Sequence, residues 1–191
     1  MNDFIGRYQC NESICDDLIE FFKQNKNSHA EGLTNNQVHK DIKDSTDLCV
    51  SADDNKEPIQ NYTKHLWDSL FAYAETYSHL NNLAMFGITE PLVIQHYKIG
   101  GGYKTWHCER GGGFGKTIKR VLVFMTYLND VPDGGTMFKY QNLTETATKG
   151  KTLIWSSDWT HTHKGQISNT KEKTIITGGF SHMWDHSFQK R

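Results

Sequence analysis

The chain has 191 residues, of which 36% are hydrophobic, and its 21 Lys and Arg against 22 Asp and Glu give a formal net charge of −1. This length predicts a single domain that is long enough to bury a core. The balanced charge excludes a basic face for binding nucleic acid, and no apolar stretch is long enough to cross a membrane.

The N-terminal half, residues 1–90, is predicted to be a helical support. It begins without the basic and apolar regions of a secretory signal, so we expect a cytoplasmic protein whose four cysteines stay reduced. Residues 11–25 combine helix-capping and acidic residues with apolar side chains at helical spacing, and residues 57–80 repeat that spacing over a longer segment. Between these two predicted helices, only residues 47–51 have the pattern of a short strand.

The C-terminal half, residues 91–181, changes to short β-rich runs separated by glycine and turn residues. These runs are residues 92–97, 103–107, 118–128, 136–140, 152–155, 164–167 and 173–180. They predict a β-sandwich or barrel of about seven or eight strands, with the helices packed on one outer face. Gly134 and Gly135 are interpreted as a hairpin turn. Because no linker separates the halves, we expect one domain over residues 1–191, ending in a short tail at residues 182–191.

A candidate metal site begins with His107 and Glu109. Two residues apart on an extended strand, these side chains project to the same side and can bind one ion. A histidine more than fifty residues downstream, His161 or His163, can supply a third ligand. Two imidazoles and one carboxylate form a facial triad that leaves adjacent positions on Fe(II) open for a bidentate cosubstrate and dioxygen. Alone, a histidine close to a glutamate on a strand is a weak signal, so the interpretation depends on the surrounding residues.

Those surroundings follow a specific order along residues 91–181. The elements are Tyr97, His107-Cys-Glu109, Tyr127-Leu-Asn, Gly134-Gly-Thr-Met-Phe138, Lys149-Gly-Lys-Thr-Leu-Ile-Trp155, His163-Lys-Gly and Lys173-Thr-Ile-Ile-Thr177. In this order and spacing the segment resembles the Fe(II)/2-oxoglutarate-dependent dioxygenases, in particular the prolyl 4-hydroxylase-like branch. The resemblance implies an α+β, mainly β fold: a double-stranded β-helix (jelly-roll, cupin-like) barrel of about eight strands with helices on one outer face.

The resemblance also implies a set of iron ligands. His107 and Glu109 look like the first two, and His163 looks like the distal one. His163 is preferred because the basic residue that binds 2-oxoglutarate in the family lies ten positions after the distal histidine, which gives Lys173 here. Counting from His161 gives Lys171, also basic, so His161 stays an alternative.

The implied cosubstrate pocket contains Lys173 and Tyr127, which would hold the far carboxylate of 2-oxoglutarate. Tyr97 and Thr177 resemble further residues that line this pocket. A lysine at this position binds as a point charge, where other members use a bidentate arginine. Each tyrosine has a plainer interpretation as a core aromatic residue with a hydrogen-bonded hydroxyl.

The implied activity is hydroxylation of a C–H bond, with 2-oxoglutarate and dioxygen consumed, succinate and CO2 formed, and ascorbate as a reductant. The substrate is a peptide or a small molecule: peptidyl proline is the family's indication, and another residue or a free small molecule stays open. The oligomeric state is not indicated. Glycine runs at residues 100–102 and 111–115 flank the first ligands and are expected to order over the substrate. Glu109 departs from the family's usual aspartate by one methylene.

Three other functions fit parts of the pattern. A non-catalytic, cupin-like metal-binding module would use His107, His161 and His163 as a closed set of ligands. A plain binding domain would need no metal and would give Lys173 no special role. A zinc hydrolase could use two histidines and a carboxylate, but it gives no reason for a pocket containing Tyr97, Tyr127 and Lys173.

Overall fold

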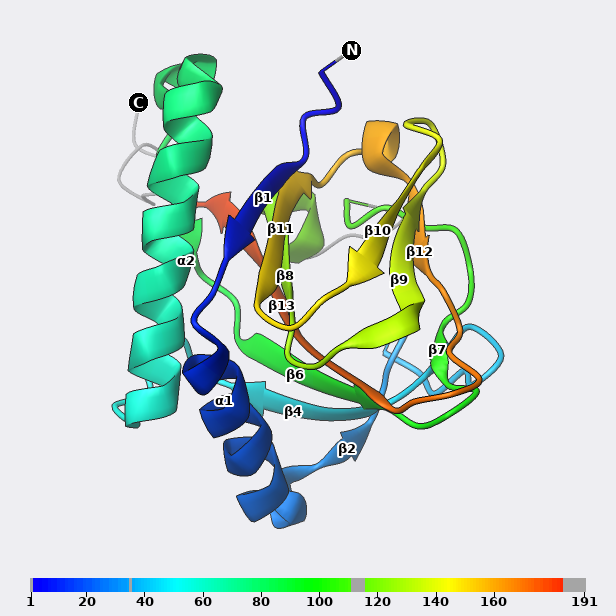
Figure 1. Cartoon of the computed structure of the whole chain (residues 1–191). Coiled ribbons are helices and arrows are strands. Elements are labelled where there is room, and N and C mark those ends of the chain that lie inside the picture. Colours follow the sequence, from blue (N-terminus) through cyan, green and yellow to red (C-terminus); the bar gives the residue numbers. More distant parts are fainter. Residues whose placement is uncertain (1, 35, 111–115, 184–191) are drawn as a thin grey trace.

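A computed structural model describes residues 2–34, 36–110 and 116–183 and shows two α-helices beside a mainly β body (Figure 1). The α-helices are α1 (Glu12–Gln24) and α2 (Glu57–Thr76), and short 3-10 turns are η1 (Lys26–Ser28), η2 (Ser78–Asn82), η3 (Lys116–Lys119) and η4 (Trp159–His161). The side chain of Asn11 caps α1 by accepting from the amide of Ser13 at 3.0 Å. Within the described part of the chain, no helix has the length and apolar character needed to cross a membrane.

The larger sheet is antiparallel and has eight strands in the order β1-β11-β8-β13-β6-β4-β2, with β5 pairing alongside β13. Its strands are β1 (Gly6–Gln9), β2 (Ala30–Glu31), β4 (Thr46–Val50), β5 (Phe86–Ile88), β6 (Leu92–Tyr97), β8 (Arg120–Tyr127), β11 (Lys151–Ser156) and β13 (Lys173–His182). Strand β13 therefore lies in the interior of this sheet, between β8 and β6.

Two smaller sheets complete the body. One has the order β10-β9-β12, formed by β10 (Leu143–Ala147), β9 (Val131–Phe138) and β12 (His163–Gly165), and the other pairs β3 (Lys43–Asp44) with β7 (Gly102–Tyr103). The fold class predicted from the sequence is confirmed: mainly β, with both helices on one outer face (Figure 1). The barrel is not closed, because the sheets of the described residues face one another without a continuous hydrogen-bonded ladder.

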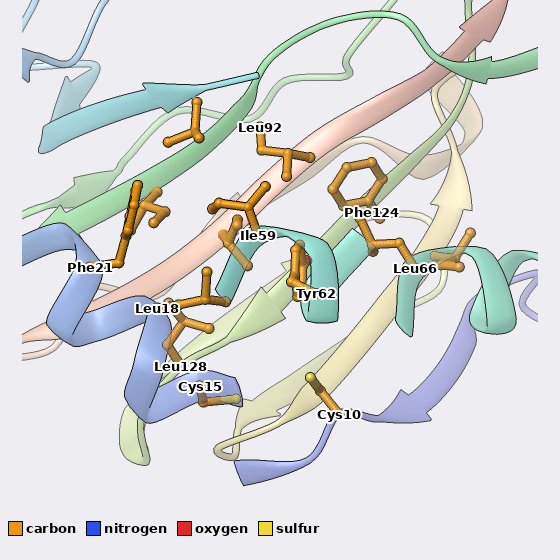
Figure 2. Packing of buried hydrophobic residues seen from close by; sticks show 14 of the residues in the cluster. Cys10, Cys15, Leu18, Phe21, Ile59, Tyr62, Leu66, Leu92, Phe124 and Leu128 are labelled. Carbon is orange, nitrogen blue, oxygen red and sulfur yellow. The ribbon is translucent and has the colours of Figure 1, made fainter. Parts of the chain in front are cut away.

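The larger sheet separates two hydrophobic clusters, since side chains alternate between its faces. Along β8, Leu122 and Phe124 pack toward the helices in an outer cluster, whereas Val123, Met125 and Tyr127 belong to an inner cluster between the sheets. Figure 2 shows the outer cluster, in which residues of the two helices meet residues of the sheet; labelled members include Leu18, Phe21, Ile59, Tyr62, Leu66, Leu92 and Phe124. The inner cluster draws on strands of the larger sheet and on β9 and β10, so it joins the facing sheets.

Several sequence-predicted elements need correction. Gly134 and Gly135 lie inside β9 and are not a hairpin turn. Glycine at position 135 allows β9 and β10 to lie close together, because a Cβ there would collide with the carbonyl of Glu145 on β10. The predicted strand at residues 103–107 is reduced to β7. Between the helices the predicted strand is β4, but the two-residue strands β2 and β3 also form there. Strands β1 and β10 are not predicted because their sequences, GRYQ and LTETA, are short and largely polar.

Candidate metal and cosubstrate site

The structure brings His107, Glu109 and His163 together. One ligand atom from each lies within 4.8 Å of the others, and Oε1 of Glu109 is 3.5 Å from Nε2 of His107 and 3.7 Å from Nε2 of His163. Backbone pairing sets this geometry: the amide of His107 donates to the carbonyl of His163 at 3.0 Å, and the amide of His163 donates back at 2.8 Å. A local bridge between distant segments thus places the two imidazoles side by side, with ring centroids 4.3 Å apart.

The other nitrogen of each imidazole is engaged by the backbone. Nδ1 of His107 lies 2.9 Å from the carbonyl of Thr105, and Nδ1 of His163 lies 2.8 Å from the carbonyl of His161. When Nδ1 donates to these carbonyls, each ring presents the lone pair of Nε2 toward Glu109. Two lone pairs and a carboxylate oxygen then converge, and this donor set is stabilised by a cation among them.

Electrostatics favour an ionised Glu109. In the ion-free protein, burial opposes the charge, but hydrogen bonds from the Nε2–H groups of the two neighbouring imidazoles outweigh burial and hold the pKa of Glu109 well below its ordinary value. A bound cation would take the place of those Nε2 protons. The second carboxylate oxygen, Oε2, accepts from Nη1 of Arg120 at 2.6 Å. Glu109 therefore offers an anionic oxygen to the site over the whole neutral range of pH.

Aromatic rings enclose the imidazoles. Tyr103 stacks on His107 with ring centroids 3.7 Å apart, and Trp155 and Phe138 pack against His163 at 5.1 and 5.7 Å. The indole N–H of Trp155 is buried and has no hydrogen-bond partner among the described residues. Nothing in the sequence pattern shows which of these rings stacks on which ligand.

His161 takes no part in this group. It is buried, and its Nε2 lies 3.0 Å from the carbonyl of Asp3 while its Nδ1 lies 3.1 Å from the hydroxyl of Thr160. These contacts tie η4 to the N-terminal segment. Among the described residues, the one group of His, Cys, Asp or Glu side chains arranged to hold a metal includes His163 and leaves His161 out.

Lys173 lies on the inner face of β13, directly opposite Tyr97 of β6, and is only 5% exposed. Its Nζ donates to the carbonyls of Gly134 at 2.7 Å and Gln166 at 3.0 Å, and lies 5.4 Å from the ring centroid of Tyr97. No carboxylate of the described residues forms an ion pair with it. Burial lowers the pKa of Lys173 to about 8. The interior thus holds a cation that lacks an anion.

Three further predicted pocket residues share this inner face, and each hydroxyl has a protein partner. Tyr127 pairs with the hydroxyl of Thr136 at 2.6 Å and Tyr97 donates to Oε1 of Gln95 at 2.6 Å. Thr177 donates to the carbonyl of Phe124 at 2.8 Å. Burial raises the pKa of both tyrosines, so their phenols stay protonated. Their hydroxyls are held in fixed positions along the same side of the sheet as Lys173.

The two predicted glycine flanks differ. Residues 100–102 connect β6 to β7, and Gly100 has a φ of 82°, a conformation that glycine adopts without strain. The second flank, residues 111–115, lies outside the described residues, as does most of the predicted tail at residues 182–191.

Solved structures with a similar fold include prolyl hydroxylases. The chain superimposes on a viral collagen prolyl hydroxylase from Paramecium Bursaria Chlorella virus-1, in a 2OG complex, with a TM-score of 0.70, 16% identity, and coverage of 94% of this chain and 97% of that one. A Pseudomonas putida prolyl-4-hydroxylase gives a TM-score of 0.70 at 13% identity, covering 95% and 94%. A Trichoplax adhaerens prolyl hydroxylase, in complex with a hypoxia inducible factor peptide fragment, gives 0.71 at 16% identity, covering 92% and 83%.

The comparisons by sequence find nothing. No family model matches the chain, and no curated protein matches it. The structural likeness covers more than nine-tenths of this chain in each comparison and shows that it has the fold of these prolyl hydroxylases.

Proposed function

We propose that this protein is an Fe(II)- and 2-oxoglutarate-dependent dioxygenase that hydroxylates a C–H bond. The proposal rests on one observation: the same fold contains a set of metal-binding side chains and a buried lysine that has no carboxylate partner. His107, Glu109 and His163 converge as a donor set for a cation, and Lys173 is a buried cation without a carboxylate partner. A ferrous ion and a dicarboxylate would satisfy both, and the fold is one in which a 2OG complex is known.

Each residue has a defined task in this proposal. His107, Glu109 and His163 would hold the iron, with the ring of Trp155 packed against His163. Lys173 would neutralise the far carboxylate of 2-oxoglutarate, with the phenols of Tyr97 and Tyr127 beside it. Bound iron and 2-oxoglutarate supply the oxidation, with succinate and CO2 as coproducts and ascorbate keeping the metal reduced. The protein's own work is to position groups and exclude water.

For the substrate we propose a peptide. The Trichoplax enzyme with this fold was solved with a peptide fragment. A peptidyl proline is the family's indication, and a free small molecule is the alternative that a substrate screen separates from it.

The decisive experiment is anaerobic titration with Fe(II) and 2-oxoglutarate, monitored for the visible metal-to-ligand charge-transfer band. We expect the wild-type protein to develop the band and His163→Ala to lose it. His161→Ala is the matched control, since it removes an imidazole two residues away that lies outside the ligand group. We expect this control to retain the band.

Two results would contradict the proposal. Absence of the band in the wild-type protein would favour a metal-binding module without catalysis or a plain binding domain. Loss of the band in His161→Ala, with retention in His163→Ala, would reverse the assignment of the distal ligand. Both variants are checked by circular dichroism, so that unfolding is not mistaken for loss of a ligand.

A further inference from the structure

Arg120, the first residue of β8, joins two carboxylates beside the candidate metal site. Its Nε and Nη2 donate to the two oxygens of Glu90 at 2.9 and 2.8 Å, and its Nη1 donates to Oε2 of Glu109 at 2.6 Å. Oε1 of Glu90 also accepts from the hydroxyl of Ser181 at 3.0 Å. The side chains of Arg120, Glu90 and Glu109 are 18%, 11% and 24% exposed, so this network is largely shielded from water.

In this network the two carboxylate oxygens of Glu109 have different partners. Oε2 is taken by Arg120, whereas Oε1 is the oxygen near Nε2 of both His107 and His163. A glutamate has one more rotatable bond than an aspartate, and an unrestrained glutamate can turn both oxygens toward an ion. Bidentate binding would occupy a coordination position that a bidentate cosubstrate and dioxygen need.

We propose that Arg120, fixed by Glu90, is a positioning residue that limits Glu109 to one metal-binding oxygen and so keeps three coordination positions open. The inference rests on the proposed function and explains how a glutamate serves at this position. Arginine suits the task because its planar guanidinium offers donors in several fixed directions, so that it binds Glu90 with one edge and Glu109 with another. Lysine has no such fixed fork and cannot reproduce this arrangement.

The fold provides a slot for the Arg120 side chain. A Cβ at Gly179 of β13 would lie 3.0 Å from both Cδ and Nε of Arg120, so the stem of the arginine passes closely over the backbone of the neighbouring strand. The position is therefore fixed at both ends: Gly179 admits the stem, and Glu90 orients the guanidinium. This second observation is independent of the contact with Glu109.

The test is titration with Co(II), whose d–d absorption reports the number of metal ligands, in the wild-type protein and in Arg120→Lys. We expect Arg120→Lys to change the band intensity and position and to shift the Co(II) dissociation constant by about tenfold to about a hundredfold, as substitutions next to metal ligands do. Arg7→Lys is the matched control, because Arg7 also binds two carboxylates, Asp3 and Glu145, but lies away from the ligands. We expect Arg7→Lys to leave spectrum and affinity unchanged.

A double-mutant cycle separates positioning from a general structural effect. In a Glu109→Asp background the carboxylate is one methylene shorter, and we expect it to lose its contact with Arg120. Arg120→Lys should then shift Co(II) affinity by less than about twofold. Glu90→Gln, which leaves the Arg120–Glu109 contact in place, should change the spectrum in the same direction as Arg120→Lys but less.

Two outcomes would overturn the inference, and they differ from failure of the proposed function. One is a Co(II) spectrum and affinity unchanged in a folded Arg120→Lys. The other is an equal effect of Arg120→Lys in both backgrounds, which would make the arginine structural only. Either result leaves the 2-oxoglutarate band of the wild-type protein, and so the proposed function, intact. If the wild-type protein binds neither Co(II) nor Fe(II), the proposed function fails and the positioning role fails with it.

Discussion

At the scale of single residues, both histidines of the metal group are oriented in the same way. In each, Nδ1 lies next to the carbonyl two residues earlier in the chain, Thr105 for His107 and His161 for His163. A contact with the backbone just before each ligand therefore sets the direction of its ring. The role of His161 is to supply that carbonyl and to anchor the N-terminal segment, through its side chain, at Asp3.

The buried lysine predicts a pH dependence of cosubstrate binding. The pKa of Lys173 is lowered to about 8 by burial, so in the protein without ligand the amine is cationic below about pH 8 and neutral above it. Binding a dicarboxylate favours the cation. We therefore expect the dissociation constant of 2-oxoglutarate to be flat below about pH 8 and to rise by up to about tenfold per unit above it, since binding then requires uptake of a proton.

The measurement is calorimetric titration of the Mn(II)-loaded protein with 2-oxoglutarate across this range of pH. Lys173→Arg is the control, because a guanidinium stays charged throughout and should remove the rise even if affinity is lower overall. The same rise in Lys173→Arg would show that another group is responsible. Unchanged binding in Lys173→Met would remove Lys173 from the cosubstrate site altogether.

At the scale of elements, β9 shows how close packing can resemble a turn in the sequence. Gly134 and Gly135 follow a Pro-Asp pair, which favours a hairpin, yet both lie within the strand. The reason is tertiary: at Gly135 the carbonyl of Glu145 occupies the space that a side chain would fill. The same strand brings the carbonyl of Gly134 to the Nζ of Lys173.

A stability prediction follows for this strand. We expect Gly135→Ala to lower the free energy of unfolding by at least about 1–3 kcal/mol, because β9 and β10 must separate to admit a methyl group. Gly165→Ala, in β12 of the same sheet, is the control: its nearest neighbour would be 3.4 Å away, an ordinary contact, and we expect a much smaller loss. Urea unfolding measures both. Equal losses would show that the Glu145 contact does not determine the effect.

The elements that could be predicted from the sequence are those with strong local periodicity. The predicted helices at residues 11–25 and 57–80 correspond to α1 and α2, and the predicted strand at residues 92–97 is β6. Strand β1 could not be predicted, because its four residues are mostly polar and its pairing with β11 joins segments far apart in the chain.

The candidate site was predictable only in part, for the same reason. The family resemblance indicated His107, Glu109 and His163, with His161 as an alternative to His163, and the structure brings the first three together. The contacts of Arg120 with Glu90 and Glu109 were not predictable, since an isolated basic residue at a strand start carries no signal. The stacking of Tyr103 on His107 could not be predicted from the sequence either, because it depends on the packing of β7 beside β12.

At the scale of the whole molecule, one face of the larger sheet packs against the two helices, and the opposite face carries the residues of the candidate site. The outer cluster fills the space between this sheet and the two helices (Figure 2), and the inner cluster lines the space between the sheets. The residues of the candidate site lie with the inner cluster: Tyr97 and Tyr127 are members, and Trp155 packs against His163.

This division predicts that stability and metal binding can be changed separately. Leu66 of α2 is fully buried in the outer cluster, so Leu66→Ala should lower the free energy of unfolding by about 2–5 kcal/mol through loss of contacts and creation of a cavity. We expect the affinity for Mn(II) to change by less than about twofold while the protein remains folded. Phe71→Ala, which removes a 63% exposed ring from the same helix, should leave both quantities nearly unchanged. A large loss of Mn(II) affinity in folded Leu66→Ala would show that the helices shape the site directly.

Strand β13 has a consequence for the fidelity of folding. Lys173 lies on its inner face, and Gly179 further along lies beneath the stem of Arg120. Because alternate residues of a strand face opposite ways, a slip of one residue against β6 and β8 would turn Lys173 toward the helices. In the direction that brings Phe180 to the place of Gly179, the same slip would also put an aromatic ring beneath Arg120. A molecule with β13 out of register in that direction would therefore lose the proposed cation for the cosubstrate and the proposed restraint on Glu109 in one event.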